Sequence, residues 1–318
     1  MAYTTTDLLA AVKRRAQLPD ANGALSDDDI LSLATIAQRT QIQPLIRSVR
    51  EDYAVVSQTQ ALVSGQQQYP IPSRAEGGAV RDVWIRTTST PTRDQQLVYI
   101  PPEDRPMFRD MRNPWWSTQA AYTVEGNDLW IAPIPDASMA SQFTLVVRYV
   151  LRPGAFIAVS SCDQITSASL SGYLVSAGSV FVGGSEPATI DVIGRLPPFR
   201  PRVISTTYTV SGVGDVDVDF DDPTAVIESP VSGDYACPTD TTCVLTCPVE
   251  AHEALIAATL VHVYETLGYT GDLQSAVALR DAQMQAVRVL MEPRTEGASR
   301  AIIDPYSPLR RARRRGAW

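Results

Sequence analysis

The chain has 318 residues, 44% of them hydrophobic, which allows one large domain or two domains of ordinary size. It contains 35 acidic and 27 basic residues, a net charge of −8, and this balance argues against broad nucleic-acid binding, which needs a positive face. The longest apolar run, Ala254 to Tyr264, is too short to cross a bilayer, and no secretory signal precedes the first helical pattern. We therefore expect a soluble protein that is made in a cytoplasm and has no membrane contact.

The first segment, residues 1–52, is predicted to be helical. Thr6-Asp7 can cap a first helix that runs to about Gln17. Ser26 can cap a second helix, whose first turn holds three aspartates near the positive end of the helix dipole. Pro44 permits a third helix to start, because proline is tolerated in a first turn.

Residues 53–151 change to strand patterns and predict an antiparallel β region. The segment 69–72 contains two prolines and is predicted at a sheet edge, because proline cannot donate to a central ladder. Residues 125–128 form a good hairpin turn between two short strands. The strongest strand pattern in the chain is that of residues 143–150.

The next segment, residues 152–247, is rich in Ser, Thr, Gly and Val and is predicted to be an inserted or decorating β domain. Helical spacing returns in residues 248–292, which predict a C-terminal helical hairpin broken at Gly268. Its second helix is expected to turn four apolar side chains inward: Val277, Met284, Val287 and Leu290. Together with an extended basic tail at residues 293–318, these segments predict an α+β fold.

The tail is the candidate binding site. From Asp304 to Trp318 it carries five arginines and one aspartate, a charge of +4, which leaves −12 for the rest of the chain. Such a segment cannot bury enough apolar surface to fold alone, and a large ring such as Trp318 favours docking in a pocket over a solvated end. The residues predicted to bind are Tyr306, Leu309, Arg310, Arg311, Arg313, Arg314, Arg315 and Trp318.

Motifs for catalysis are missing from the sequence, and we predict no enzyme activity, no cofactor and no metal. His252-Glu253 begins like a zincin motif, but position 256 is Ile, so the second ligand is missing, and both His252 and His262 are expected to have structural roles. Aspartates alternate from Asp215 to Asp222. A strand would hold them on one solvent-exposed face, whereas a calcium site needs oxygen ligands that converge from a loop, so a calcium site is the weaker interpretation. Trp115-Trp116 could stack on a ligand, although burial in a core or a subunit contact is favoured.

The four cysteines have a spacing that matches no paired zinc pattern. They are Cys162, Cys237, Cys243 and Cys247. We expect free thiols, with a disulfide or a metal site as the alternatives.

Two stretches, together with the arginine-rich tail, carry a family resemblance. They are residues 26–53, from Ser26-Asp27-Asp28-Asp29 to Glu51-Asp52-Tyr53, and residues 65–83, which include Gly65-Gln66-Gln67-Gln68-Tyr69-Pro70. With the tail, they resemble head-to-tail adaptor (connector) proteins of tailed double-stranded DNA bacteriophages. The 152–247 segment takes no part in this resemblance.

The resemblance implies a structural protein of the virion neck, made in the host cytoplasm. Such adaptors form a ring, commonly twelvefold, beneath the portal protein and above a tail or nozzle protein. Genomic DNA would pass through the ring without sequence specificity, and the C-terminal segment would reach onto the portal. Whether the tail arginines contact the portal or DNA stays open, and a carbohydrate-binding or other β-rich interaction module is the alternative function.

Overall fold

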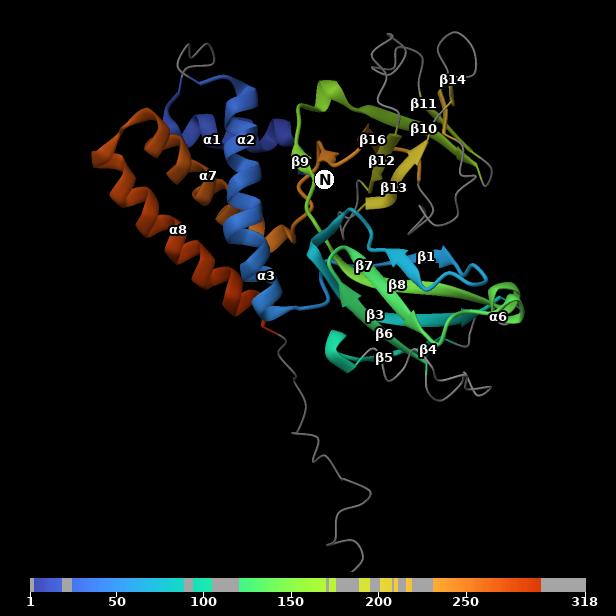
Figure 1. Ribbon diagram of the computed structural model, residues 1–318. Helices are drawn as coiled ribbons and strands as arrows, with labels where there is room; N and C mark the ends of the chain where they lie inside the picture. Colours follow the sequence, from blue (N-terminus) through green and yellow to red (C-terminus); the bar gives the residue numbers. More distant parts are fainter. Residues whose placement is uncertain are drawn as a thin grey trace, which may run out of the picture.

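The computed structural model confirms an α+β fold, with helices at both ends of the described chain and several sheets between them (Figure 1). The structure describes residues 3–18, 25–88, 94–104, 120–169, 172–175, 189–194, 201–207, 209–210, 216–218 and 231–292.

A helical body combines the first helices of the chain with the last two. It consists of α1 (Thr5–Ala16), α2 (Asp27–Ala37), α3 (Gln43–Val49), α7 (His252–Leu267) and α8 (Thr270–Met291). The helix α7 is buried along most of its length and contacts α1, α2 and α8. None of the described helices combines the length and the hydropathy needed to cross a membrane.

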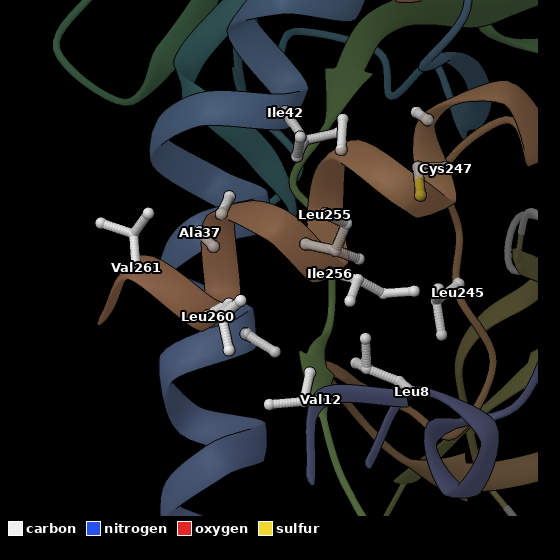
Figure 2. Close-up of a cluster of buried hydrophobic side chains, with 14 of the residues drawn as sticks. Leu8, Val12, Ala37, Ile42, Leu245, Cys247, Leu255, Ile256, Leu260 and Val261 are labelled. Atoms are coloured by element: carbon white, nitrogen blue, oxygen red, sulfur yellow. The ribbon is translucent and has the colours of Figure 1, made fainter. Parts of the chain in front are cut away.

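The core of this body joins residues that are far apart in the sequence. In Figure 2, Leu8 and Val12 of α1 lie close to Leu255 and Ile256 of α7, and all four side chains are fully buried. Replacing one of these leucines by alanine would lower the free energy of unfolding by about 2–5 kcal/mol. The loss has two parts: the hydrophobic transfer energy of the removed atoms and the cost of the cavity they leave. The N- and C-terminal helices therefore fold as one unit.

Local hydrogen bonds explain where α1 and α2 begin. The Ser26 hydroxyl caps α2, and the Asp29 carboxylate accepts from the Ser26 backbone N–H at 2.9 Å, a complete capping box. The predicted cap of α1 at Thr6-Asp7 is wrong by two residues, since Thr4 caps the helix and Asp7 occupies its third position. The reciprocal pair of Thr4 and Asp7 satisfies two backbone donors, which Thr6 could not do.

Pro44 lies in the first turn of α3, as predicted, although no loop separates α3 from α2. The chain stays helical from α2 through a π-helical segment, η1 (Gln38–Ile42), into α3. The Gln43 N–H donates to the Gln38 carbonyl, five residues earlier, instead of the usual four. This wider turn accommodates Pro44, which lacks the N–H that a regular helix would need at that point.

Two four-stranded sheets share a second core and form a sandwich next to the helical body (Figure 1). One has the order β1-β8-β3-β4 and the other β2-β7-β6-β5. Their bounds are β1 (Val55–Ala61), β2 (Gln68–Pro70), β3 (Ala75–Thr87), β4 (Asp94–Gln96), β5 (Val98–Tyr99), β6 (Ala121–Glu125), β7 (Asp128–Ala132) and β8 (Phe143–Leu151). Two short elements accompany them: η2 (Pro102–Asp104) and α6 (Ala137–Gln142).

Three strand predictions are confirmed. The strand β2 with Pro70 lies at a sheet edge, where the missing N–H costs no ladder bond. The strands β6 and β7 pair across the turn from Glu125 to Asp128, in which Gly126 has a φ of 64°. The strand β8 is central, paired with both β1 and β3, as the strong pattern of residues 143–150 indicated.

Between β8 and α7 the chain forms a seven-stranded sheet with the order β13-β12-β16-β10-β11-β15-β14. Its strands are β10 (Asp163–Ser169), β11 (Gly172–Val175), β12 (Thr189–Ile193), β13 (Pro201–Thr207), β14 (Thr209–Val210), β15 (Val216–Val218) and β16 (Tyr235–Pro238). The short strands β9 (Ala155–Phe156) and β17 (Thr241–Thr242) pair in parallel before and after it. Two 3-10 turns, η3 (Val159–Ser161) and η5 (Val249–Ala251), complete this part of the chain.

The two ends of the segment between β8 and α7 pack against the helical body. Phe156, Leu245 and Cys247 lie in the helical core, and the Phe156 N–H donates to the Thr35 hydroxyl of α2 at 2.9 Å. The Thr5 N–H donates to the Cys243 carbonyl, also at 2.9 Å. Residues 155–157 and 241–247 therefore help to hold the helices together, whereas the seven-stranded sheet extends beyond them.

Candidate interaction surface

The last helix, α8, is packed on one side only. Ala276, Val287 and Met291 are buried, and Val277 and Met284 are partly buried against the same core. In Figure 1, α8 lies at the edge of the helical body farthest from the sandwich, and its last turn approaches α3. The opposite side of α8 is therefore available for a partner.

The prediction that Leu290 points inward is wrong. The side chain is 63% exposed, whereas the neighbouring Met291 is buried. At about 100° per residue, Met291 lies close to the centre of the face that contains Ala276 and Val287, and Leu290 lies on its flank. Sequence spacing alone made both positions plausible, and the packing against α7 and α3 selected Met291.

Leu290 instead belongs to an exposed apolar stripe along α8, which we call the outer stripe. Its members follow one another at spacings of three, four and four residues, which places them on one helix face. They are Leu279, Ala282, Ala286 and Leu290, all exposed. An exposed leucine by itself is ordinary, but a continuous stripe with small residues between two leucines is typical of a helix–helix contact. The spacing of this stripe is visible in the sequence, but its exposure depends on which side of α8 the helical body covers.

The predicted basic tail follows α8 directly. Leu290 lies in the last turn of the helix, and residues 293–318 lie outside the described part of the chain. The eight predicted binding residues, from Tyr306 to Trp318, thus stay a prediction. What the structure adds is the position of the last described residue, Glu292, which follows Leu290 and Met291 at the end of α8.

Both histidines lie on α7 and have structural partners, as the sequence predicted. His252 is buried, its Nε2 lies 3.2 Å from the Cys247 carbonyl oxygen, and its ring packs on Tyr3 at 4.9 Å between centroids. Burial lowers the pKa of His252 below its usual value, which keeps the ring neutral. The Nδ1 of His262 lies 3.0 Å from the Glu265 carboxylate.

Two other motifs from the sequence cannot be placed. Trp115-Trp116 lies outside the described residues, and of the aspartate run only the backbone of residues 216–218 is described. No described geometry therefore supports a stacking platform or a calcium site there.

The structure brings three of the four cysteines together. The sulfurs of Cys162, Cys237 and Cys243 all lie within 4.8 Å of one another, and the three residues are buried. Cys247 lies apart from them, in the helical core. The spacing of the cysteines in the sequence does not predict this grouping, because it depends on the pairing of β10 with β16.

Comparison with known proteins adds one finding. The family model described as SU10 adaptor protein matches residues 3–177, more than half of the 318-residue chain. The matched region includes α1, α2, α3 and the whole sandwich. No curated protein matches the chain.

Proposed function

This chain belongs to the SU10 adaptor protein family, and we propose that it forms a ring that docks beneath the portal of a tailed double-stranded DNA bacteriophage. The observation that carries the proposal is the family match over residues 3–177, which agrees with the resemblance of the first helices to head-to-tail adaptors. In this role the protein is a structural component of the virion neck and not an enzyme. The ring would be twelvefold, with a tail or nozzle protein below it.

We propose that the outer stripe of α8 forms part of the contact between neighbouring subunits. Its support is the exposure of Leu279 and Leu290 on one continuous apolar face of α8. The alanines between them allow a second helix to approach closely. The exposed fractions of Leu279 (39%) and Leu290 (63%) add up to about one leucine side chain, so burying both at such a contact would contribute about 1.5–3 kcal/mol per interface before the cost of association.

The charge distribution suits a DNA conduit. Outside residues 304–318 the chain carries a net charge of −12, so a channel built from this part would repel the phosphate backbone and let the genome slide. The tail has the opposite charge and would reach up to acidic groups of the portal. Direct contact between the tail arginines and DNA is the competing possibility.

Electron microscopy of the full chain mixed with its portal tests the proposal. We expect a cyclic complex, with the added ring on one end of the portal, and the protein in purified virions. The isolated protein can be monomeric if assembly needs the portal as a template, so the protein alone serves as the baseline. A mixture that shows bare portals, or virions that lack this protein, would contradict the adaptor role.

A further inference from the structure

The cysteine cluster lies at the base of the seven-stranded sheet. Cys162 stands between η3 and β10, Cys237 lies in β16, and Cys243 follows β17. The Sγ atoms of Cys162 and Cys237 are 2.6 Å apart, and that of Cys243 is 3.7 Å from Cys237. Cys237 and Cys243 are completely buried, and Cys162 is nearly so.

Strand pairing explains why Cys162 meets Cys237. The strands β10 and β16 are antiparallel, and Asp163 is paired with Ala236. One further step of the same register places Cys162 opposite Cys237. The other six strands of the seven-stranded sheet lie within the 74 residues between the two cysteines, and β16 contains Cys237 itself. This pair therefore lies at the point where the chain enters and leaves the sheet.

We propose that Cys162 and Cys237 are a modification site, at which oxidation by a small peroxide forms a disulfide that closes the base of the seven-stranded sheet. The reaction is balanced by one molecule of hydrogen peroxide. Two S–H bonds and the O–O bond break, one S–S bond forms, and two molecules of water leave. Each sulfur is oxidised by one electron, and the two peroxide oxygens are reduced.

Cys243 supplies the reactive form of sulfur. Hydrogen bonds from Cys162 and Cys237 lower the pKa of Cys243 to about 5. A thiolate is the species that peroxide oxidises, giving a sulfenic acid that a neighbouring thiol converts to a disulfide. Cys237 contacts both other sulfurs. The Cys162 sulfur can therefore attack Cys237 in the Cys237–Cys243 disulfide, which forms the Cys162–Cys237 bond and breaks the Cys237–Cys243 bond, while the Cys162 proton passes to the departing Cys243 sulfur.

The surroundings favour a neutral cross-link over a metal ion. Ile193 and Val244 are buried in the same cluster, and Ile157 and Val159 pack against it. Structural zinc takes four protein ligands, and the cluster brings together three such residues among those the structure describes. A disulfide carries no charge and needs only two of the three sulfurs.

The cross-link would form after synthesis. A bacterial cytoplasm keeps thiols reduced, whereas a protein released from the cell meets oxidants. Closing a loop of this length restricts the unfolded chain, so the oxidised protein should unfold at a higher urea concentration than the reduced protein. The chemistry needs neither the portal nor a ring, and its failure would leave the adaptor role untouched.

The test uses the purified full chain, reduced and then exposed to hydrogen peroxide. We expect the number of free thiols, counted after denaturation, to fall from four to two, with a loss of two hydrogens in the mass. Digestion at arginine and aspartate separates Cys162, Cys237 and Cys243 into different peptides, so the linked pair can be identified in the unmodified sequence. Cys162 linked to Cys237 is the expected product.

Two variants serve as controls. Cys237→Ser removes the sulfur that contacts both others, so the Cys162–Cys237 link should be absent after peroxide treatment. Cys247→Ser should still lose two thiols, because Cys247 lies apart from the other three sulfurs, in the helical core. Four thiols remaining in the folded wild-type protein would overturn the proposal. So would a link between Cys237 and Cys243 as the main product, or one equivalent of zinc retained by the protein as purified.

Discussion

The guanidinium of Arg74 forms a buried ion pair with the carboxylate of Asp191, across the junction between the sandwich and the seven-stranded sheet. Arg74 is 4% exposed and lies just before β3, and Asp191 is fully buried in β12. The Nε of Arg74 is also 2.8 Å from Asp240, whose backbone N–H donates to Asp191 at 3.0 Å. One arginine thus connects the sandwich with β12 and with the turn between β16 and β17.

Arg74→Met should therefore destabilise the protein by about 3–5 kcal/mol, because it leaves the buried Asp191 carboxylate without its counter-charge. The double variant Arg74→Met/Asp191→Asn should lose less unfolding free energy than the sum of the losses in the two single variants. Urea unfolding of the four proteins measures this coupling. As a matched control, Arg86→Ala breaks the partly exposed bidentate pair with Asp94 and should cost less than about 1 kcal/mol. If Arg74→Met and Arg86→Ala lose equal amounts of unfolding free energy, burial does not determine how much an ion pair contributes to the stability of this protein.

The outer stripe predicts a separation of stability from assembly. Leu290→Asp should lower the free energy of unfolding by only about 1 kcal/mol, since the side chain is exposed in the monomer and the cost comes from helix propensity and from a negative charge in the last turn of α8. It should nevertheless prevent ring formation on the portal, because the contact would bury an unpaired charge. Gln285→Asp introduces the same charge at an exposed position outside the stripe and should leave rings intact. If Leu290→Asp assembles like the wild type, the stripe is not the subunit contact.

The tail predicts an anchor residue. Truncation after Ile303 should abolish or strongly weaken binding to the portal. Trp318→Ala should weaken the free energy of portal binding by about 2 kcal/mol or more if the indole side chain fills a pocket. Any single Arg→Ala change in the tail should cost less, because exposed ion pairs contribute under about 1 kcal/mol. DNA binding is measured at several salt concentrations as well as portal binding. If the tail arginines contact DNA, the affinity for DNA should fall steeply as the salt concentration rises. A truncated protein that docks as well as the full chain would exclude the tail as the connector.

His252 predicts a pH-dependent stability. In the unfolded chain its imidazole takes up a proton near pH 6.5, whereas burial lowers its pKa in the folded protein. The unfolded state thus binds more protons below that pH, and stability should fall on acidification by up to about 1.4 kcal/mol per pH unit. His252→Gln should flatten the profile between about pH 7 and pH 5, as measured by urea midpoints. An unchanged slope in this variant would assign the pH dependence to other groups.

The boundaries of the predicted 152–247 domain are a proposal that deletion can test. Because residues 155–157 and 241–247 contact the helices, we place the deletion at residues 165–234 and join the paired residues Gln164 and Tyr235 by Asn-Gly. Arg74 is replaced by Met in the same protein, since its partner Asp191 is removed. We expect the helical body and the sandwich to keep their secondary structure by circular dichroism and to bind the portal. Complete loss of folding would show that the sheet is part of the core.

Signals that act over a few residues were sufficient for much of this fold. Ser26 with Asp29, the turn around Gly126, Pro70 at an edge and Gly268 after α7 each determine a conformation through hydrogen bonds or backbone sterics within one turn. The sequence alone therefore placed most helices and strands, and it indicated the adaptor family through the first helices. Chain-distant partners decided the remainder. Packing selected Met291 over Leu290, and pairing of β10 with β16 brought Cys162 to Cys237. The fold also buried Arg74 against Asp191, since burial and contacts between distant segments are properties of the tertiary structure that no local pattern encodes.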